Sequence, residues 1–542
     1  MSSELESSLR RPMTRATERI GFLIGFLLVS PVAAQSIRPE RTGFRETSSY
    51  ADVLSFLDSL QLVTKDVRIG VLATSHQGRR IPYVIAARPL VTTPAEAHRT
   101  GKPIVYLQAN IHGGEVEGKE AVQMLLRDLT VGPLQAMLGK IVLLAVPIYN
   151  ADGNERWAAG ERNRPGQNGP EPVGQNPNGQ GLNLNRDYIK MEAPETRGSA
   201  ALLVSWDPDL FIDLHTTNGS YHGYVLTYAW GLNPNTNPAV EFVRDRLLPQ
   251  VRRRMQQRHQ QRTFSYGNFR SQEPDSLVQG WETYDARPRF GTNWMGLRGR
   301  LAILSEGYSN ADFRSRIVAT YNFVREVLSV AGEHPASIKR ATLASDRRRP
   351  DSVAIRSALA PPVVQEVVAE VTRDLGAGSD GYARRQRTGV YRTIRMPVYD
   401  RFTPARMEAL PAGYLIPPRL TNVVNILRRQ GIAIDEAKRS WMTRAQVFMV
   451  TSLAVDSLFE GHRSVRVEGH WNRGTADTTI TEGWYWATTD QPLGSLLGYL
   501  LEPASEDGVV TWNLLDRELQ TGSAYPIVRV TTLPRMPRLA VP

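Results

Sequence analysis

The chain has 542 residues, no cysteine, a formal net charge of +11 and a hydrophobic fraction of 41%. This length corresponds to roughly three domains, and the composition excludes a disordered, a collagen-like or a multi-span membrane protein. Without cysteine there are no disulfides, thiolate metal ligands or cysteine nucleophiles, so any metal must be bound by His, Asp or Glu. Only seven of the 65 basic residues are lysine. The arginines are dispersed, which indicates a solvated surface and no nucleic-acid partner.

The first 34 residues have the pattern of a signal peptide. A basic stretch precedes the apolar run Ile20–Val29, and small residues follow up to Ala34. The run is short for a membrane span, and this order of segments is typical of a cleaved export signal. We expect a start at Met1 or Met13, cleavage after Ala34, and an exported protein, periplasmic or extracellular, without a stable membrane span. An uncleaved anchor is the alternative.

Residues 45–335 alternate between amphipathic stretches and continuous apolar runs. Runs such as Pro103–Ile111 and Lys140–Ile148 are typical of strands buried on both faces, and intervening helices indicate parallel pairing. The sequence therefore predicts an α/β fold with a mixed, mostly parallel sheet flanked by helices. Further predicted strands are Val67–Ala73, Ile81–Ala87, Leu210–Leu214 and Leu301–Leu304, and the predicted helices are Ser49–Leu62 and Val116–Leu129.

The remaining residues predict a second unit. Residues 338–360 contain many Arg, Ser and Pro residues and predict a linker, and residues 361–542 predict a smaller β-rich domain. A stretch rich in Gly, Asn and Pro at residues 153–181 predicts a long functional loop. Predicted strands of the second unit are Thr388–Tyr399, Ala445–Leu453, Ser464–Trp471 and Trp484–Thr489, and predicted helices are Leu420–Arg429 and Leu493–Leu501.

A histidine and a glutamate follow one of the buried strands. Strand Pro103–Ile111 runs into His112, two glycines and Glu115, and a helix follows. Ligand sites of open α/β sheets lie at this carboxyl edge, and the glycines permit a tight turn. Both side chains are zinc ligands in other proteins. A polar helix start without a metal is the alternative.

A second histidine follows another predicted strand. Strand Leu210–Leu214 ends in His215, and Asp213 lies two residues earlier on the same face. Asp213 is therefore placed to orient a ligand histidine or to hold a substrate group. Two His and one Glu leave a fourth position for water, as in catalytic zinc sites, whereas a half-buried histidine in the packing is the alternative.

Two further motifs complete the candidate site. Strand Leu301–Leu304 runs into Glu306, and a carboxylate at the end of a buried strand is costly unless it is paired or functional. It is placed to act as a general base, or else it is a salt-bridged core residue. Asn185 and Arg186 offer an amide and a forked cation that suit a carboxylate. A loop held by local side-chain bonds is the alternative for this pair.

The order of these motifs resembles the zinc metallocarboxypeptidases of the carboxypeptidase A type. The resemblance covers roughly residues 45–335 and includes residues 75–79 and 150–153, and the C-terminal part resembles an extension of some secreted bacterial members. It implies a carboxypeptidase-like fold and one Zn²⁺ per chain. The implied roles are zinc ligation for His112, Glu115 and His215, general base for Glu306, and binding of the substrate's terminal carboxylate for Asn185 and Arg186.

Other family roles have more than one candidate. The family uses an arginine to polarise the scissile carbonyl, and the resemblance leaves Arg162 and Arg164 as candidates. For the family's mobile tyrosine, the resemblance favours Tyr284 over Tyr221 and Tyr224. Asn183 stands where the family often has an acidic residue.

The resemblance implies a metallocarboxypeptidase that hydrolyses the C-terminal bond of a peptide substrate with a free carboxylate. The chemistry implied is attack by a metal-activated water with Glu306 as general base. The alternative function is a deacylase or amidase that acts on acyl-amino acids or cell-wall peptides through the same site. A binding protein without activity is disfavoured because the ligands and the base are all present.

Overall fold

The computed structural model describes residues 35–273, 276–377 and 383–531, so the predicted signal segment 1–34 lies outside the described residues. An eight-stranded mixed sheet runs through the first part of the chain, in the order β1-β2-β4-β3-β5-β10-β6-β7. The strands are β1 Val67–Thr74, β2 Arg80–Ala86, β3 Ile104–Ala109, β4 Val142–Val146, β5 Leu210–Thr216, β6 Leu226–Trp230, β7 Thr263–Ser265 and β10 Leu301–Gly307.

The centre of this sheet is parallel. Strands β4, β3, β5 and β10 pair in parallel with one another, and β6 pairs in parallel with β7. The pairs β1–β2, β2–β4 and β10–β6 are antiparallel. Every residue of β3, β4, β5 and β10 is buried, which accounts for their continuous apolar sequences. The prediction of a mixed, mostly parallel sheet is confirmed.

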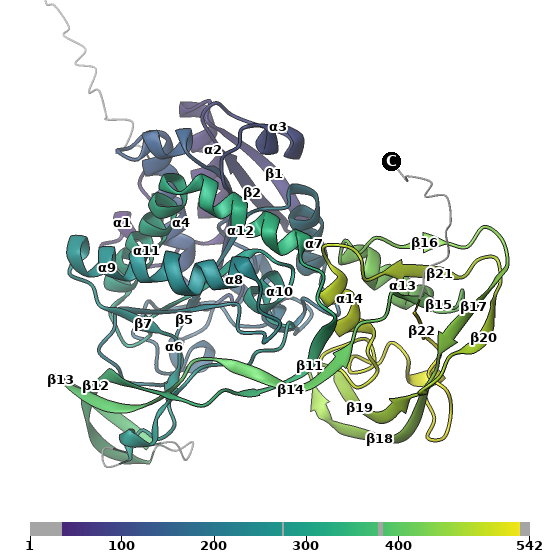
Figure 1. Ribbon diagram of the computed structural model, residues 1–542. Coiled ribbons are helices and arrows are strands. Elements are labelled where there is room, and N and C mark those ends of the chain that lie inside the picture. The colour runs from purple at the N-terminus through teal and green to yellow at the C-terminus, as the bar shows by residue number, and fades with distance from the viewer. Residues whose placement is uncertain (1–34, 274–275, 378–382, 532–542) are drawn as a thin grey trace, which may run out of the picture.

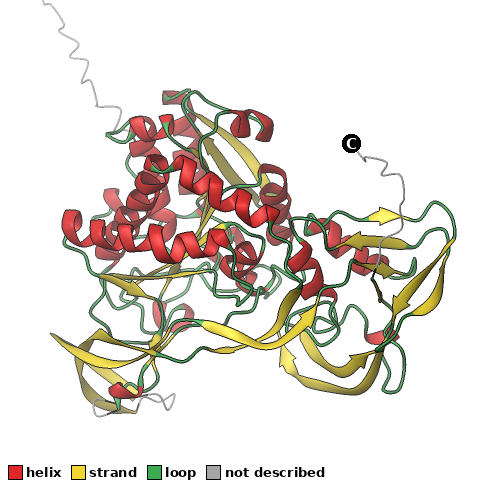
Figure 2. Ribbon diagram, viewed as in Figure 1, coloured by secondary structure: helices red, strands yellow, loops and turns green. Residues whose placement is uncertain are grey.

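Helices cover both faces of the sheet (Figures 1 and 2). Helix α4 packs so closely that a Cβ at Gly118 would lie 2.8 Å from Leu214 Cβ of β5. On the opposite face, the Tyr106 hydroxyl of β3 lies 3.0 Å from the Ser199 hydroxyl of α7. The helices of this part are α1 Arg38–Arg41, α2 Tyr50–Val63, α3 Pro94–Arg99, α4 Glu117–Thr130, α5 Ala151–Asn154, α6 Gly160–Asn163, α7 Pro194–Trp206, α8 Pro238–Phe242, α9 Leu248–His259, α10 Gly291–Leu297, α11 Phe313–Glu333 and α12 Pro335–Arg347.

Local sequence explains where the long helices begin. Ser49 caps α2 by accepting a hydrogen bond from the Asp52 amide, and the Asp52 side chain accepts from the Ser49 amide in return. Asp312 caps α11 by accepting from the Ser315 amide. Short turns of tighter or wider pitch are η2 Gln135–Gly139, η3 Leu184–Arg186, η4 Val243–Leu247, η5 Leu277–Gln279 and η6 Asp516–Glu518.

The predicted linker 338–360 is wrong, because these residues form most of α12 and all of β11 (Ser352–Leu359). One face of α12 is buried and consists of Ile338, Ala341, Thr342 and Ser345. These residues recur at helical spacing, a pattern that the many Arg and Ser residues of the segment obscured. Strand β11 pairs with β14 (Phe402–Ala409) in a two-stranded ribbon below the main sheet (Figure 1).

A long hairpin returns from the second unit to the first. Strands β12 (Val363–Ala377) and β13 (Ala383–Tyr399) pair with each other, and β13 also pairs with β9 (Trp281–Glu282), which pairs with β8 (Asn268–Phe269). Strands β12 and β13 therefore pack with the predicted catalytic unit, across the boundary placed at residue 361.

The remaining C-terminal region is β-rich, as predicted. A six-stranded sheet has the order β16-β21-β15-β22-β17-β20, and β18 and β19 form a separate hairpin. The predicted strand Ala445–Leu453 is divided between β17 and β18, because β17 pairs with β20 whereas β18 pairs with β19. The elements are β15 Gly413–Ile416, β16 Asp435–Glu436, β17 Trp441–Gln446, β18 Phe448–Phe459, β19 His462–Trp471, β20 Ala476–Ile480, β21 Tyr485–Thr488, β22 Val528–Val530, α13 Thr421–Arg429 and α14 Gly494–Leu501.

Within the described residues, every helix is too short or too polar to cross a membrane.

Candidate metal centre

The carboxyl ends of three neighbouring strands converge on one site. Strands β3, β5 and β10 are adjacent and parallel, so their ends meet at one edge of the sheet. Glu306 of β10 stands beside His215 of β5 in the register. His112 and Glu115 lie in the turn that follows β3. The tertiary structure thus brings together the side chains predicted from strand ends.

Tight packing explains the two glycines between His112 and Glu115. A Cβ at Gly113 would clash with the backbone of Gly153, and one at Gly114 would lie 2.6 Å from the Gly174 carbonyl oxygen. The Asn110 side-chain amide donates to the carbonyl groups of His112, Gly113 and Glu115 at 3.1–3.2 Å. Backbone packing around the glycines and the hydrogen bonds from Asn110 therefore fix the conformation of this turn without a bound ligand.

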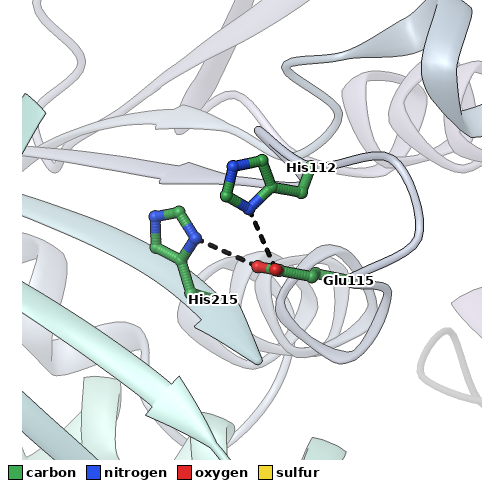
Figure 3. Close-up of side chains that lie close together, drawn as sticks. All are labelled: His112, Glu115 and His215. Carbon is green, nitrogen blue, oxygen red and sulfur yellow. Dashed lines mark hydrogen bonds and ion pairs between the residues drawn. The ribbon is translucent and has the colours of Figure 1, made fainter. Parts of the chain in front are cut away.

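His112, Glu115 and His215 face one another at this edge (Figure 3). Glu115 Oε1 lies 2.9 Å from His112 Nδ1, and Glu115 Oε2 lies 3.0 Å from His215 Nδ1. One ligand atom from each residue lies within 4.8 Å of the others, and all three side chains are buried. Two imidazole nitrogens and one carboxylate oxygen are the donor set of a three-residue zinc site with an open fourth position. The residues present therefore fit a zinc ion.

The charges of the three residues support that assignment. Burial acts to raise the pKa of Glu115, but the charges of His112 and Arg164 and the bonds from both histidines outweigh it, so the pKa lies well below its usual range. Burial acts to lower the pKa of His215, but Asp213 and Glu115 outweigh it, and the pKa lies well above its usual value. Glu115 is thus ionised, and the cluster gathers negative charge around the imidazoles, as a cation site requires.

The outer nitrogen of each histidine has a polar neighbour. His112 Nε2 lies 3.1 Å from Asn183 Oδ1. His215 Nε2 lies 3.1 Å from Asp213 Oδ2. This second contact lacks hydrogen-bond geometry, so both Asp213 oxygens are buried without a hydrogen bond among the described residues. Such partners fix the ring orientation and leave each Nδ1 for a metal.

Glu306 is a buried carboxyl beside this cluster. Its Oε2 atom has no hydrogen-bond partner among the described residues. Burial raises the pKa of Glu306 to about 8, and the charge of Glu115 adds to the rise while His215 opposes it. A carboxyl with such a pKa can both take and return a proton near neutral pH.

Of the two candidate arginines, only Arg164 reaches the cluster. Its guanidinium donates to Glu115 Oε1 at 3.0 Å and to the Thr216 carbonyl at 3.2 Å, and it is buried. Arg162 is exposed on α6, so its position does not support the predicted catalytic role. The two residues lie at the end of the four-residue helix α6, which is too short for sequence periodicity to separate them.

Asn185 contacts His215 of the cluster, and Arg186 and Tyr284 both pack on Phe290. Asn185 Nδ2 lies 3.4 Å from His215 Nε2, and Asn185 Oδ1 accepts from the Gly291 amide at 3.0 Å. The Arg186 guanidinium stacks on Phe290 at 3.9 Å. Burial, followed by the charge of Glu306, raises the pKa of Tyr284 well above its usual value.

Supporting residues that sequence reasoning missed lie behind the cluster. The Thr216 amide donates to Glu115 Oε2 at 3.0 Å, and its hydroxyl donates to Glu117 Oε1 at 2.5 Å. Arg316 of α11 lies 3.4 Å from Glu117 Oε2. The sequence signals were a second acidic residue shortly after Glu115 and a threonine next to His215, but their pairing depends on how α4 and β5 pack.

Comparison with known proteins identifies the domain. Residues 53–287 match the family model described as zinc carboxypeptidase. These residues are therefore similar to a zinc carboxypeptidase domain. The chain is accordingly a hydrolase of the metallocarboxypeptidase type. Glu306 lies beyond the matched residues.

Curated relatives extend the similarity beyond that domain. The chain is 23% identical to Carboxypeptidase 2 of Trichophyton tonsurans over 487 residues, which covers 84% of this chain and 81% of that protein. Carboxypeptidase 2 of Trichophyton rubrum gives the same identity and coverage over 488 residues. These relatives are fungal, so the expected affinity to bacterial members is not supported. A solved metallocarboxypeptidase from Pseudomonas aeruginosa is 18% identical, with a TM-score of 0.39 over 54% of this chain and 70% of that chain.

Proposed function

We propose that the chain is an exported zinc carboxypeptidase that hydrolyses the C-terminal peptide bond of peptides with a free carboxylate. The observation that carries the proposal is the cluster of His112, Glu115 and His215 with Glu306 beside it on the neighbouring strand. The family match favours peptide hydrolysis over the deacylase or amidase alternative.

His112, Glu115 and His215 would hold one zinc ion. Zinc, when bound, lowers the pKa of a water ligand to about 7 and polarises the carbonyl group of the substrate. The buried cluster excludes competing water and keeps both imidazoles oriented through Asp213 and Asn183.

Glu306 acts as the general base in this proposal. Its unpartnered Oε2 atom takes a proton from the attacking water and then passes it to the leaving amine. Burial holds the pKa of Glu306 at about 8, close to that of the groups between which the proton moves. Because water attacks directly, the mechanism needs no covalent intermediate.

Arg164 is placed to stabilise the negative charge that develops on the carbonyl oxygen. Its guanidinium is buried and already directed at Glu115 by a bond of 3.0 Å. A preorganised cation in a site shielded from water contributes strongly to transition-state stabilisation.

Asn185 and Arg186 bind the carboxylate of the substrate's last residue in this proposal, with Tyr284 beside them. The Arg186 guanidinium lies 3.9 Å from the centre of the Phe290 ring, and this packing holds it in place for a paired interaction with a carboxylate. This pair makes the enzyme an exopeptidase, since it requires a chain end.

Metal content tests the proposal. We expect one zinc per wild-type chain by atomic emission, and a large loss of both zinc and hydrolysis of N-benzoylated dipeptides in His215→Ala. His470→Ala is the matched control, because His470 is exposed on the surface of β19. Equal zinc in wild type and His215→Ala would contradict the assigned site.

Export is the other part of the proposal. Gln35, the residue after the predicted cleavage site, is buried and donates through its side chain to the Ser59 carbonyl at 3.2 Å. The signal-peptide pattern of residues 1–34 leads us to expect a mature protein that begins at Gln35 when the full chain is expressed with an export system. Mass spectrometry of the intact secreted protein measures this start, and a product that retains residues 1–34 would refute it.

A further inference from the structure

The segment that carries Asn185 and Arg186 is held from outside by the C-terminal region. Gln430 Nε2, just after α13, donates to the Tyr188 and Ile189 carbonyl groups at 3.0 and 3.3 Å. The Lys190 ammonium lies 5.5 Å from the centre of the Trp512 ring. Residues more than 200 positions away in sequence therefore fix the binding segment.

The tip of the β18–β19 hairpin contacts both ends of this segment. The Asn183 amide donates to Glu460 Oε2 at 3.1 Å. His462 Nε2 lies 2.9 Å from Glu192 Oε1. Glu460 and Gly461 form the two-residue turn between β18 and β19, and their φ angles of 49° and 80° are those of a tight hairpin turn.

The hairpin tip is also tied to the loop that follows Tyr284. The Arg289 guanidinium lies 5.3 Å from the centre of the Phe459 ring. Arg289 in turn donates to Asp507 Oδ1 at 2.9 Å, and this pair is buried. The position of Glu460 is therefore set by packing on two sides of the hairpin.

Glu460 is the main opposing charge for Arg186. Burial lowers the pKa of Arg186, and Glu460 is the first of the charges that oppose this fall, followed by Asp285. Asp285 is already paired with Arg287. Glu460 bonds to a backbone amide, and within the described residues it forms no ion pair with a cationic side chain. A carboxylate without its own cation is thus held on the amide of Asn183, three residues before Arg186.

We propose that Glu460 is a specificity-determining residue that selects substrates whose C-terminal residue has a cationic side chain. Arg186 takes the terminal carboxylate, and Glu460 attracts a lysine- or arginine-like side chain and repels an acidic one. This assignment rests on the proposed function and adds the substrate class. It also gives the C-terminal region a direct part in the site.

Three substrates that differ only in the last residue test the assignment: benzoylglycyl-lysine, benzoylglycyl-leucine and benzoylglycyl-glutamate. Glu460→Gln keeps an oxygen that can accept from the Asn183 amide and removes only the charge. We expect the ratio of kcat/KM for lysine over leucine to fall roughly tenfold, the effect of one partly exposed charge at close range. The ratio for glutamate over leucine should rise several-fold.

The matched control is Asp456→Asn on the same hairpin, where Asp456 pairs with Arg466 at 2.8 Å. We expect both ratios to be unchanged in that variant. Calorimetric binding of free lysine, leucine and glutamate to each variant gives a readout that does not depend on turnover, and the preference for lysine should weaken in Glu460→Gln alone.

The outcomes separate the two proposals. A wild-type enzyme that cleaves these substrates with ratios unaffected by Glu460→Gln overturns the role of Glu460 and leaves the proposed function standing. An equal gain for all three substrates in Glu460→Gln also overturns it, because Glu460 would then only shield Arg186. A zinc-loaded wild type that cleaves none of the three overturns both.

Discussion

The central sheet and the C-terminal region expose their strands very differently. All residues of β3, β5 and β10 are buried, whereas most residues of β14 and β18 are exposed or half-exposed. The proposed catalytic groups lie at the ends of the buried strands, where packing on both faces fixes the backbone. The C-terminal region instead reaches the site with a hairpin tip and single side chains. The buried sheet thus fixes the proposed catalytic groups, whereas the more exposed C-terminal region contributes to the proposed substrate recognition.

The largest expected effect tests whether chemistry resides at the sheet edge. We expect Glu306→Gln to lower kcat by about 10³-fold or more, because a general base contributes about 10² to 10⁴. Zinc content should be retained, since Glu306 is not among the three ligand residues. Steady-state kinetics and metal analysis check this, and an active variant would exclude Glu306 as the base.

The next prediction compares the catalytic contributions of Arg164 and Arg162. Arg164→Ala should lower kcat by roughly 10²- to 10³-fold, the size expected when one oxyanion-stabilising group is lost. Arg162→Ala is the control, since Arg162 is exposed, and its kinetics should match wild type. Similar losses in both variants would argue against a specific role for Arg164.

A third pair compares the packing of the two regions directly. Leu107 of β3 is fully buried, whereas Leu458 of β18 is 65% exposed. We expect Leu107→Ala to lower the free energy of unfolding by about 2–5 kcal/mol, and Leu458→Ala to change it by less than about 0.5 kcal/mol. Thermal or denaturant unfolding measures both. Equal losses would mean that the exposed hairpin is covered in solution.

The smallest expected effect concerns stability against pH in metal-free protein. Burial raises the pKa of Glu306 from 4.5 to about 8, so the folded state binds this proton more tightly than the unfolded state. Its contribution to stability is therefore present below pH 4.5 and is lost as the pH rises to 8. Relative to wild type, Glu306→Gln should gain about 1.4 kcal/mol for each pH unit across that range. A constant difference in Tm between pH 5 and pH 8 would contradict the raised pKa.

Sequence periodicity determined the strands that build the site. The apolar runs before His112, His215 and Glu306 could be read as strands buried on both faces, because such strands need apolar residues at every position. Their polar ends then pointed to one edge of a parallel sheet, where the structure places all three residues. That part of the site follows from local sequence and one topological rule.

Only the tertiary structure determined the contacts between residues that are distant in the sequence. It separated Arg164 from Arg162, paired β13 with β9, and formed α12 and β11 from the predicted linker. It also placed Glu460 on the Asn183 amide across 277 positions of sequence. Local periodicity reports whether a segment is helical or extended and which face is apolar. The contacts of loops and hairpin tips depend on how the finished elements pack, so no short-range pattern encodes them.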